Sequence, residues 1–225
     1  MKISVIIPVY NEKDTIKKII DRVIAVPFEK EIIVVDDFST DGTRDILKNM
    51  NTDNVTTVFH DKNKGKGAAI RTGIQYVNGD AVVIQDADLE YDPSELLKLI
   101  DPIKEGKADV VYGSRFSGTA KEMTISHLLG NKLLTIATNI LYGTRLTDME
   151  TCYKMVKTPI IKSLQLRANR FDFEPEITAK LLKSKKRILE VPISYRGRDW
   201  TEGKKITWRD GLSALWSLIK YRFVD

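Results

Sequence analysis

Short runs of aliphatic residues recur along the first half of the chain without any alternation of polar and apolar positions. They span Ile3–Val9, Glu31–Val35, Val55–Phe59, Ala81–Gln85 and Asp109–Tyr112. Strands that are covered on both faces show this pattern. The segments between them predict helices at Asp14–Ile24, Thr43–Asn49, Ala68–Val77 and Ser94–Ile103. Because strands and helices alternate as far as residue 115, we expect an α/β fold with a doubly wound, mainly parallel sheet.

After Arg115 the pattern changes. It predicts a long helix at 122–142, an extended segment at Leu146–Val156, a helix at Glu176–Leu182, a strand at Arg187–Tyr195 and a terminal helix at 207–223. The apolar residues of the terminal helix share one face: Trp208, Leu212, Leu215, Trp216, Ile219 and Phe223. With Arg209, Lys220 and Arg222 beside it, this face suits either a membrane interface or docking on the core.

Composition narrows the class of protein. The chain has 225 residues, 42% hydrophobic and 30% charged, which is typical of a soluble globular protein. Its longest uncharged stretch, Leu133–Thr144, has 12 residues, against about 20 needed to cross a bilayer. We therefore expect a soluble or peripheral protein, and the single Cys152 suits a reducing compartment. Residues 183–225 carry 11 Lys/Arg and 5 Asp/Glu, which favours a phosphate-bearing or anionic partner on that side.

Two groups of acidic residues follow predicted strands. Asp36 and Asp37 end one strand, and Asp86, Asp88 and Glu90 follow another. In an extended segment the last three would share one face and repel one another unless a cation joined them. Hard carboxylate oxygens favour Mg²⁺ or Mn²⁺. Solvated loop acids are the plainer alternative.

Several motifs occur together in a fixed order. They are Val5–Glu12, Val34–Thr43, Asp86–Asp88, Gly113–Arg115, Leu146–Lys154, Phe171–Glu176 and Val191–Tyr195. The set resembles the family 2 glycosyltransferases of the GT-A fold, and more narrowly the dolichyl- or polyprenyl-phosphate mannose and glucose synthases. The resemblance implies one GT-A domain over residues 1–225, with a nucleotide-binding half at 1–115 and an acceptor half at 116–225.

The resemblance also implies roles on the donor side. The base and ribose pocket would be lined by Pro8, Tyr10, Glu12, Val35 and Asp37. Asp86, Ala87 and Asp88 would meet the ribose and diphosphate, with Asp88 and Glu90 on the metal and Arg115 pairing with the diphosphate. Lys66 stands in a segment that lacks the residue order of a P-loop. It would either contact the nucleotide from a helix N-terminus or belong to a simple turn.

Other positions concern the acceptor. Arg198 and Lys205, with Lys204 as an alternative, resemble a pair that closes over the donor diphosphate and acceptor phosphate. His127 and Asn131 stand where mannose-transferring relatives carry Arg and Ser, so Lys132 would have to supply the positive charge. Glu174 and Glu176 stand near the general base of relatives that use a hydroxyl acceptor. In an enzyme with a lipid-phosphate acceptor they would instead support other site residues.

The resulting expectation is an inverting, metal-dependent hexosyltransferase. It would use a donor such as GDP-mannose or UDP-glucose, and a polyprenyl or dolichyl phosphate at the cytoplasmic face of the membrane. The alternative is a GT-A enzyme with a hydroxyl acceptor on a glycan or glycolipid. A nucleic-acid partner is disfavoured, because acids at the strand ends would repel a phosphate backbone.

Overall fold

The computed structural model describes residues 1–121, 125–197 and 208–224. Its first half alternates as predicted through β1 (Ile3–Val9), α1 (Ile16–Ala25), β2 (Lys30–Asp36), α2 (Thr43–Lys48), β3 (Val55–Phe59), α3 (Lys66–Ile74), β4 (Ala81–Ile84), the 3₁₀ turn η1 (Pro93–Glu95) and α4 (Leu96–Lys104). All seven residues of β1 are buried. Burial on both faces explains why β1 shows no alternation of polar and apolar residues.

The second half departs further from the sequence-based expectation. It contains β5 (Val110–Lys121), α5 (Ile125–Tyr142), β6 (Lys154–Lys157), α6 (Thr158–Ser163), α7 (Phe173–Lys183), β7 (Ile188–Arg196) and α8 (Trp208–Phe223). The extended segment expected at Leu146–Val156 forms a strand only from Lys154. Helix α6 was not predicted, since six residues are too few to show a helical period. β5 continues past Tyr112 through an irregular register with β7 between Ser114 and Thr119.

The sheet has seven strands in the order β3-β2-β1-β4-β6-β5-β7. β6 runs antiparallel to both of its neighbours, and the other pairs are parallel. This confirms a doubly wound, mainly parallel sheet. The strand order reverses between β1 and β4, and ligands of such sheets bind beyond the carboxyl ends of the strands at this point.

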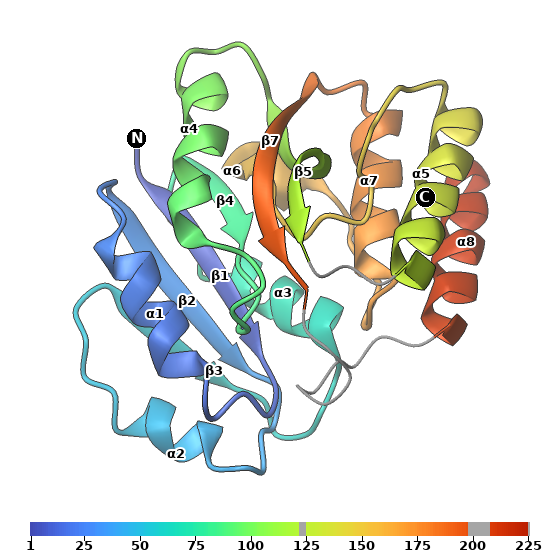
Figure 1. The fold of residues 1–225 in the computed structure, drawn as a ribbon. Helices are drawn as coiled ribbons and strands as arrows, with labels where there is room; N and C mark the ends of the chain where they lie inside the picture. Colours follow the sequence, from blue (N-terminus) through green and yellow to red (C-terminus); the bar gives the residue numbers. More distant parts are fainter. Residues whose placement is uncertain (122–124, 198–207, 225) are drawn as a thin grey trace.

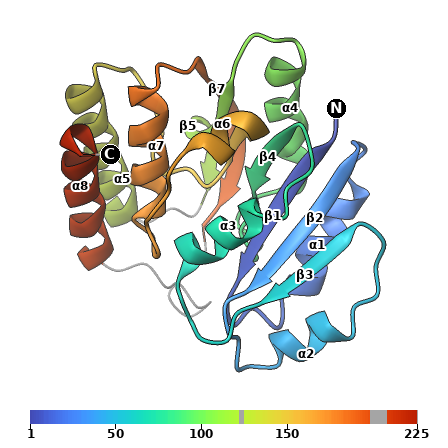
Figure 2. The same ribbon diagram turned by 180° about the vertical axis from the view of Figure 1, so that it is seen from behind.

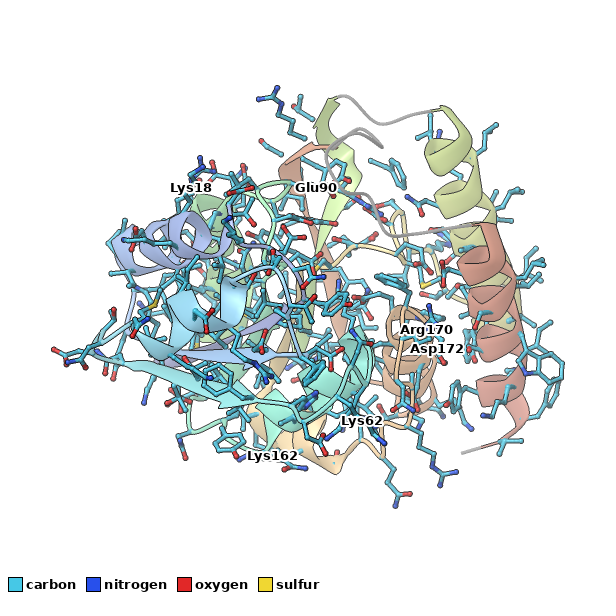
Figure 3. All side chains as sticks on the ribbon, turned by 90° about the horizontal axis from the view of Figure 1, so that it is seen from below. Lys18, Lys62, Glu90, Lys162, Arg170 and Asp172 are labelled. Atoms are coloured by element: carbon cyan, nitrogen blue, oxygen red, sulfur yellow. The ribbon has the colours of Figure 1, made fainter. Side chains whose placement is uncertain are left out.

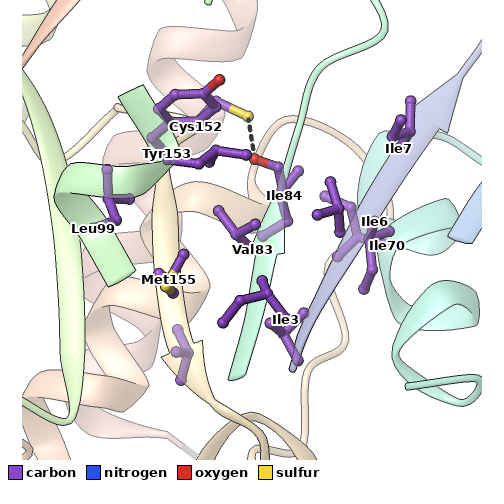
Figure 4. Packing of buried hydrophobic residues seen from close by; sticks show 14 of the residues in the cluster. Ile3, Ile6, Ile7, Ile70, Val83, Ile84, Leu99, Cys152, Tyr153 and Met155 are labelled. Carbon is purple, nitrogen blue, oxygen red and sulfur yellow. Dashed lines mark hydrogen bonds between the residues drawn. The ribbon is translucent and has the colours of Figure 1, made fainter. Parts of the chain in front are cut away.

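Helices cover both faces of the sheet. α1 and α4 lie on one face, and α3, α6 and α7 lie on the other (Figures 1 and 2). The core between these layers includes the isoleucines and valines of β1, β2 and β4, and Figure 4 shows part of it around β1 and β4. Cys152 belongs to it, with Sγ 3.8 Å from the carbonyl oxygen of Ile84. The core therefore fixes the strand ends from which the site is built.

Helices α5 and α8 lie side by side at the end of the molecule away from α1 and α2 (Figures 1 and 2). The Tyr142 hydroxyl in α5 donates to the carbonyl oxygen of Leu218 in α8, at 2.8 Å. Lys180 in α7 lies 4.9 Å from the ring centre of Tyr221. The side of α8 that packs on α5 and α7 is not the predicted apolar face, because Leu212, Leu215, Trp216, Ile219 and Phe223 of that face are all exposed. Docking of that face on the core, one of the two alternatives, is therefore not what the structure shows.

Candidate active site

The parallel strands β1, β2 and β4 end at one edge of the sheet, where the predicted base and ribose residues lie. Pro8 lies opposite Val35 in the register of β1 and β2. Tyr10 and Glu12 follow β1, and Asp37 follows β2. The fold therefore brings these five residues to the same edge, and their contact with a nucleotide stays a prediction.

Asn11 fastens the loop after β1 to the loop after β2. Its backbone N–H donates to Ser39 Oγ at 2.9 Å, and the Thr40 N–H donates to its Oδ1 at 2.8 Å. The backbone of Asn11 has a φ of 52°, in the left-handed region that asparagine tolerates better than most residues. The Glu12 N–H also donates to Thr43 Oγ1, at 3.0 Å. One wall of the candidate pocket is thus held by cross-loop hydrogen bonds.

The carboxylate of Asp37 has a role that the sequence did not predict. It is buried and accepts hydrogen bonds from the backbone N–H groups of Lys64 (2.8 Å) and Gly65 (2.7 Å). His60 Nδ1 lies 2.7 Å from the same carboxylate. Asp37 therefore anchors the segment that precedes α3.

The three acids after β4 do not share a face, so that prediction was wrong. The chain bends between Asp86 and Glu90 instead of staying extended. Asp86 pairs with Lys66 at 2.5 Å, Asp88 Oδ1 accepts from the Glu90 N–H at 3.0 Å, and Glu90 Oε2 accepts from the Tyr195 hydroxyl at 2.7 Å. An aspartate that bonds the backbone two residues on favours a turn over an extended strand. Figure 3 shows Glu90 beside β5 and β7.

Within the described ranges, no group of three or more His, Cys, Asp or Glu side chains is placed to hold a metal ion. Asp88 Oδ1 accepts from the Glu90 N–H, so these two residues are neighbours in the bend after β4. Mg²⁺ commonly takes only one or two protein carboxylates and completes its shell with substrate phosphates and water. The hard oxygen donors of Asp88 and Glu90 fit this pattern.

Lys66 is the first residue of α3. Its side chain points not to solvent but toward Asp86, Asp88 and Glu90, which we call the acid motif. Burial alone would lower the pKa of Lys66, but the carboxylates of Asp86 and Glu174 raise it well above its usual value. Burial raises the pKa of Cys152, so this residue stays a thiol. Lys66 therefore brings a permanent positive charge to the carboxyl end of β4.

Arg115 forms a buried, bidentate ion pair with Asp148. Its Nε and Nη2 donate to the two carboxylate oxygens at 2.7 and 2.8 Å, and its backbone N–H donates at 3.0 Å. The guanidinium also lies 5.2 Å from the ring centre of Tyr195. The planar fork that we expected to bind the diphosphate is thus engaged within the protein. This geometry favours a role for Arg115 in positioning Tyr195, which bonds Glu90.

Glu174 and Lys154 form a buried pair behind Lys66. Lys154 Nζ donates to Glu174 Oε2 and to the carbonyl oxygen of Thr151. Glu174 Oε1 is buried and has no hydrogen-bond partner among the described residues. Glu174 lies in the first turn of α7, so the helix dipole also favours its negative charge.

Glu150 belongs to the same cluster and was not predicted as a site residue. Its Oε1 is also buried without a hydrogen-bond partner in the part of the chain that the structure describes. Burial raises the pKa of Glu150 to about 7, against the opposing effect of Lys154 and with a further contribution from Glu174. A carboxyl group that titrates near neutral pH is typical of functional sites. The signal available in the sequence was its place within the motif Leu146–Lys154.

Glu176 is engaged in a different task. It pairs with Lys180 at 2.9 Å and accepts from the backbone N–H groups of Arg167 and Ala168. These bonds hold the loop that precedes α7, where Figure 3 labels Arg170 and Asp172. Glu176 is therefore occupied in holding this loop. Of the two glutamates considered as a general base, Glu174 is the one that this geometry favours.

The acceptor residues are placed only in part. His127 and Asn131 lie one turn apart on α5, and the side chain of His127 falls outside the described residues. Lys132 is exposed, with Nζ 6.0 Å from the ring centre of Phe116, next to Arg115. Arg198, Lys204 and Lys205 also lie outside the described residues. These roles stay predictions.

Exposed apolar side chains lie on both α5 and α8, which pack against each other. Those on α5 are Leu129, Leu133, Ile136 and Ile140, and those on α8 are Leu212, Leu215, Trp216, Ile219 and Phe223. We call these nine side chains the α5–α8 apolar face. Within the described ranges, no helix is both long and apolar enough to span a membrane.

A solved structure of another protein shares this fold. A crystal structure of glucosyl-3-phosphoglycerate synthase from Mycobacterium tuberculosis, with Mn²⁺, UDP and phosphoglyceric acid, superposes with a TM-score of 0.76. It is 20% identical, and the match covers 100% of this chain and 79% of that one. At this level of identity the likeness shows the fold, which confirms the predicted GT-A architecture.

Two curated relatives match most of the chain. It is 32% identical to UDP-N-acetylglucosamine–dolichyl-phosphate N-acetylglucosaminyltransferase of Methanococcus voltae, over 85% of this chain and 84% of that protein. It is 30% identical to dolichol-phosphate mannosyltransferase of Pyrococcus furiosus, over 92% of this chain and 61% of that protein. A further relative is matched over only 53% of its length.

The family model described as glycosyl transferase family 2 matches residues 4–164, which include the strand-end loops, the acid motif, Arg115 and Glu150. Matches to the model and to both relatives agree with the motifs found in the sequence. The chain belongs to glycosyl transferase family 2.

Proposed function

We propose that this glycosyltransferase transfers a hexose, with inversion, from a nucleotide sugar to a polyprenyl or dolichyl phosphate. The observation that carries the proposal is the similarity, over 85% and 92% of the chain, to two enzymes named for dolichyl-phosphate glycosylation. The site supports it: the loops after β1 and β2 and the acids after β4 meet at the edge where such sheets bind nucleotides.

On the donor side, residues 1–115 would hold the nucleotide. Pro8, Tyr10 and Val35 line the edge of β1 and β2, and Asp88 and Glu90 would hold Mg²⁺ or Mn²⁺. When bound, such a cation neutralises negative charge on the departing diphosphate. The Tyr195 hydroxyl keeps Glu90 oriented by donating to Oε2.

On the acceptor side, a phosphate oxygen would attack the anomeric carbon as the bond to the diphosphate oxygen breaks. A phosphate monoester is already anionic near neutral pH, so this reaction requires no general base. Lys132 and the unplaced Arg198 and Lys205 would supply the positive charge that holds the acceptor. The donor base and sugar are left open between the GDP-mannose and UDP-glucose types.

A hydroxyl acceptor is the second candidate, and one observation favours it. Glu174 Oε1 is buried without a partner among the described residues, beside the Lys66–Asp86 pair. A hydroxyl nucleophile needs a carboxylate of this kind to take its proton. In that case Glu174→Gln would abolish transfer, whereas transfer to a lipid phosphate would survive the substitution.

The α5–α8 apolar face supports attachment to a membrane surface, which we place at the cytoplasmic side. Leu133, Ile140, Trp216 and Phe223 are 65%, 77%, 66% and 79% exposed. Many exposed apolar side chains on two neighbouring helices favour an interaction site. Lys220 and Arg222 flank it on α8, and tryptophan with basic residues is typical of helices that lie in the lipid interface.

The test of the proposed reaction is a transfer assay with radiolabelled GDP-mannose, UDP-glucose and UDP-N-acetylglucosamine, each with Mn²⁺ or Mg²⁺. Product is extracted into organic solvent in the presence and absence of a short polyprenyl phosphate. We expect extraction of label to depend on the lipid phosphate for one donor. Transfer only to a hydroxyl-bearing glycan or glycolipid would support the second candidate instead.

Membrane attachment is tested separately by flotation with vesicles that contain anionic lipid. The variant Leu133→Ser/Trp216→Ser should float less than the wild type, because it removes two exposed apolar groups from the α5–α8 apolar face. Ile24→Ser is the control, since Ile24 is also an exposed apolar residue, 41% exposed, but lies on α1. Equal flotation of all three proteins would contradict a membrane role for this face.

A further inference from the structure

A buried chain of hydrogen bonds joins three elements at the nucleotide edge of the sheet. His60 directly follows β3, and its Nδ1 lies 2.7 Å from Asp37 Oδ1. Its Nε2 lies 2.9 Å from Thr72 Oγ1 in α3. The side chains of His60 and Asp37 are both buried.

The partners of the imidazole fix the direction of both hydrogen bonds. The Asp37 carboxylate also accepts from two backbone N–H groups, those of Lys64 and Gly65, so it acts as an acceptor toward Nδ1 as well. Nδ1 therefore carries the proton, and in the neutral ring Nε2 is an acceptor. The Thr72 hydroxyl can donate to it, which holds the ring in this tautomer and orientation.

The same carboxylate controls the segment that leads into α3. Asp37 binds Lys64 and Gly65, and the next residue, Lys66, forms the ion pair with Asp86. Gly65 has a φ of 97°, and a Cβ there would overlap the carbonyl oxygen of Asn169, so this segment has little room to shift. Asp37 after β2 is thus linked to the acids after β4 through its bonds to Lys64 and Gly65 and through the Lys66–Asp86 ion pair.

We propose that His60 is a positioning residue for binding of a nucleoside diphosphate. Its Nδ1–H orients Asp37, and Asp37 in turn holds the Lys64–Lys66 segment so that Lys66 meets Asp86. Thr72 contributes by keeping the imidazole in the tautomer that can donate to Asp37. The inference rests on the proposed function, because it assigns this network to the nucleotide site of that reaction.

Two substitutions separate the two ends of the imidazole. His60→Asn places an amide near the position of Nδ1 and so can still donate to Asp37. His60→Gln places its amide near the position of Nε2, which preserves a polar contact with Thr72 but withdraws the donor from Asp37. Both variants lose the ring, so they share the cost of reduced packing. Thr72→Val removes the hydroxyl while keeping the shape of the side chain.

The first measurement is calorimetric binding of UDP and GDP in the presence of Mn²⁺ to each full-length variant, together with its Tm. We expect His60→Asn to bind within about threefold of the wild type. His60→Gln should bind about tenfold more weakly, the scale of one hydrogen bond to a charged group. Thr72→Val should fall between them. Equal binding by the Asn and Gln variants would overturn the proposal, as would losses that follow Tm alone.

The second measurement uses no nucleotide. Hydrogen exchange of the Lys64 and Gly65 amides should be at least tenfold faster in His60→Gln than in His60→Asn, because these amides lose a fixed acceptor. ¹⁵N NMR of the wild type should show the proton on Nδ1. If the wild type binds neither UDP nor GDP, the proposed function fails while these readouts still report on the network. If exchange is the same in both variants, the inference about His60 fails whatever the nucleotide data show.

Discussion

The carboxyl group of Glu150 should make the stability of this protein depend on pH in an unusual direction. Burial, opposed by Lys154 and reinforced by Glu174, raises the pKa of Glu150 from 4.5 to about 7. The folded state therefore binds this proton more tightly than the unfolded chain does. The resulting stabilisation is fully present below pH 4.5 and is lost as the pH rises through 7.

The size of the effect follows from the two pKa values. A difference of about 2.5 corresponds to about 3 kcal/mol between the protonation states. The contribution of Glu150 to the free energy of unfolding should accordingly decrease by up to about 3 kcal/mol between pH 4.5 and pH 8. Glu150→Gln is neutral at every pH and should lose this dependence. Relative to the wild type, the variant should become more stable as the pH rises.

Urea unfolding at pH 5, 6, 7 and 8, followed by circular dichroism, measures this difference. Burial also raises the pKa of Glu190, but that residue is present in both proteins and cancels when they are compared. Glu105→Gln is the matched control, because Glu105 is exposed and forms its ion pair with the exposed Lys107. If wild type and Glu150→Gln give parallel curves across this range, the buried, proton-binding state of Glu150 is refuted.

Three further predictions concern other residues of the site. Asp148→Asn leaves the buried Arg115 guanidinium without its countercharge, so it should lower the free energy of unfolding by about 3–5 kcal/mol in urea titrations. An unchanged midpoint of urea unfolding would contradict the importance of this pair. Asp88→Ala should abolish transfer in the radiolabel assay. It should lower the free energy of unfolding by only about 1 kcal/mol, because the hydrogen bond from the Glu90 backbone N–H is lost. Full turnover would exclude Asp88 from the metal site. His127→Ala/Lys132→Ala should raise KM for polyprenyl phosphate roughly tenfold or more while sparing nucleotide affinity; an unchanged KM would place the acceptor elsewhere.

The sequence by itself determined the first half of the fold. β1 begins and ends where its aliphatic run does, because a strand buried on both faces leaves an uninterrupted apolar signal. β3 also has the predicted bounds, although none of its residues is buried. The same aliphatic runs predicted that the candidate acids lie at strand ends. The position where each run stops marks the carboxyl end of its strand, and parallel strands end at the same edge of the sheet. The order of the motifs then identified the family, which the match over residues 4–164 confirms.

Only the tertiary structure decided how the charged groups are paired. Arg115 meets Asp148, 33 positions along the chain, and Lys66 meets Asp86 through the packing of α3 against the sheet. No local pattern encodes such pairs, because they depend on which strands become neighbours. The bend after Asp86 likewise comes from side-chain bonds that a strand period does not predict.

The fold also decided which faces of the last helices are covered. The apolar stripe of α8 was compatible with either a lipid interface or the core. In the structure Leu218 and Tyr221 are buried, while Leu212, Trp216 and Phe223 are exposed. Sequence periodicity shows that a helix has an apolar face, but it cannot say what covers that face. That depends on the neighbouring elements, here α5 and α7, whose positions are set by contacts distant in the sequence.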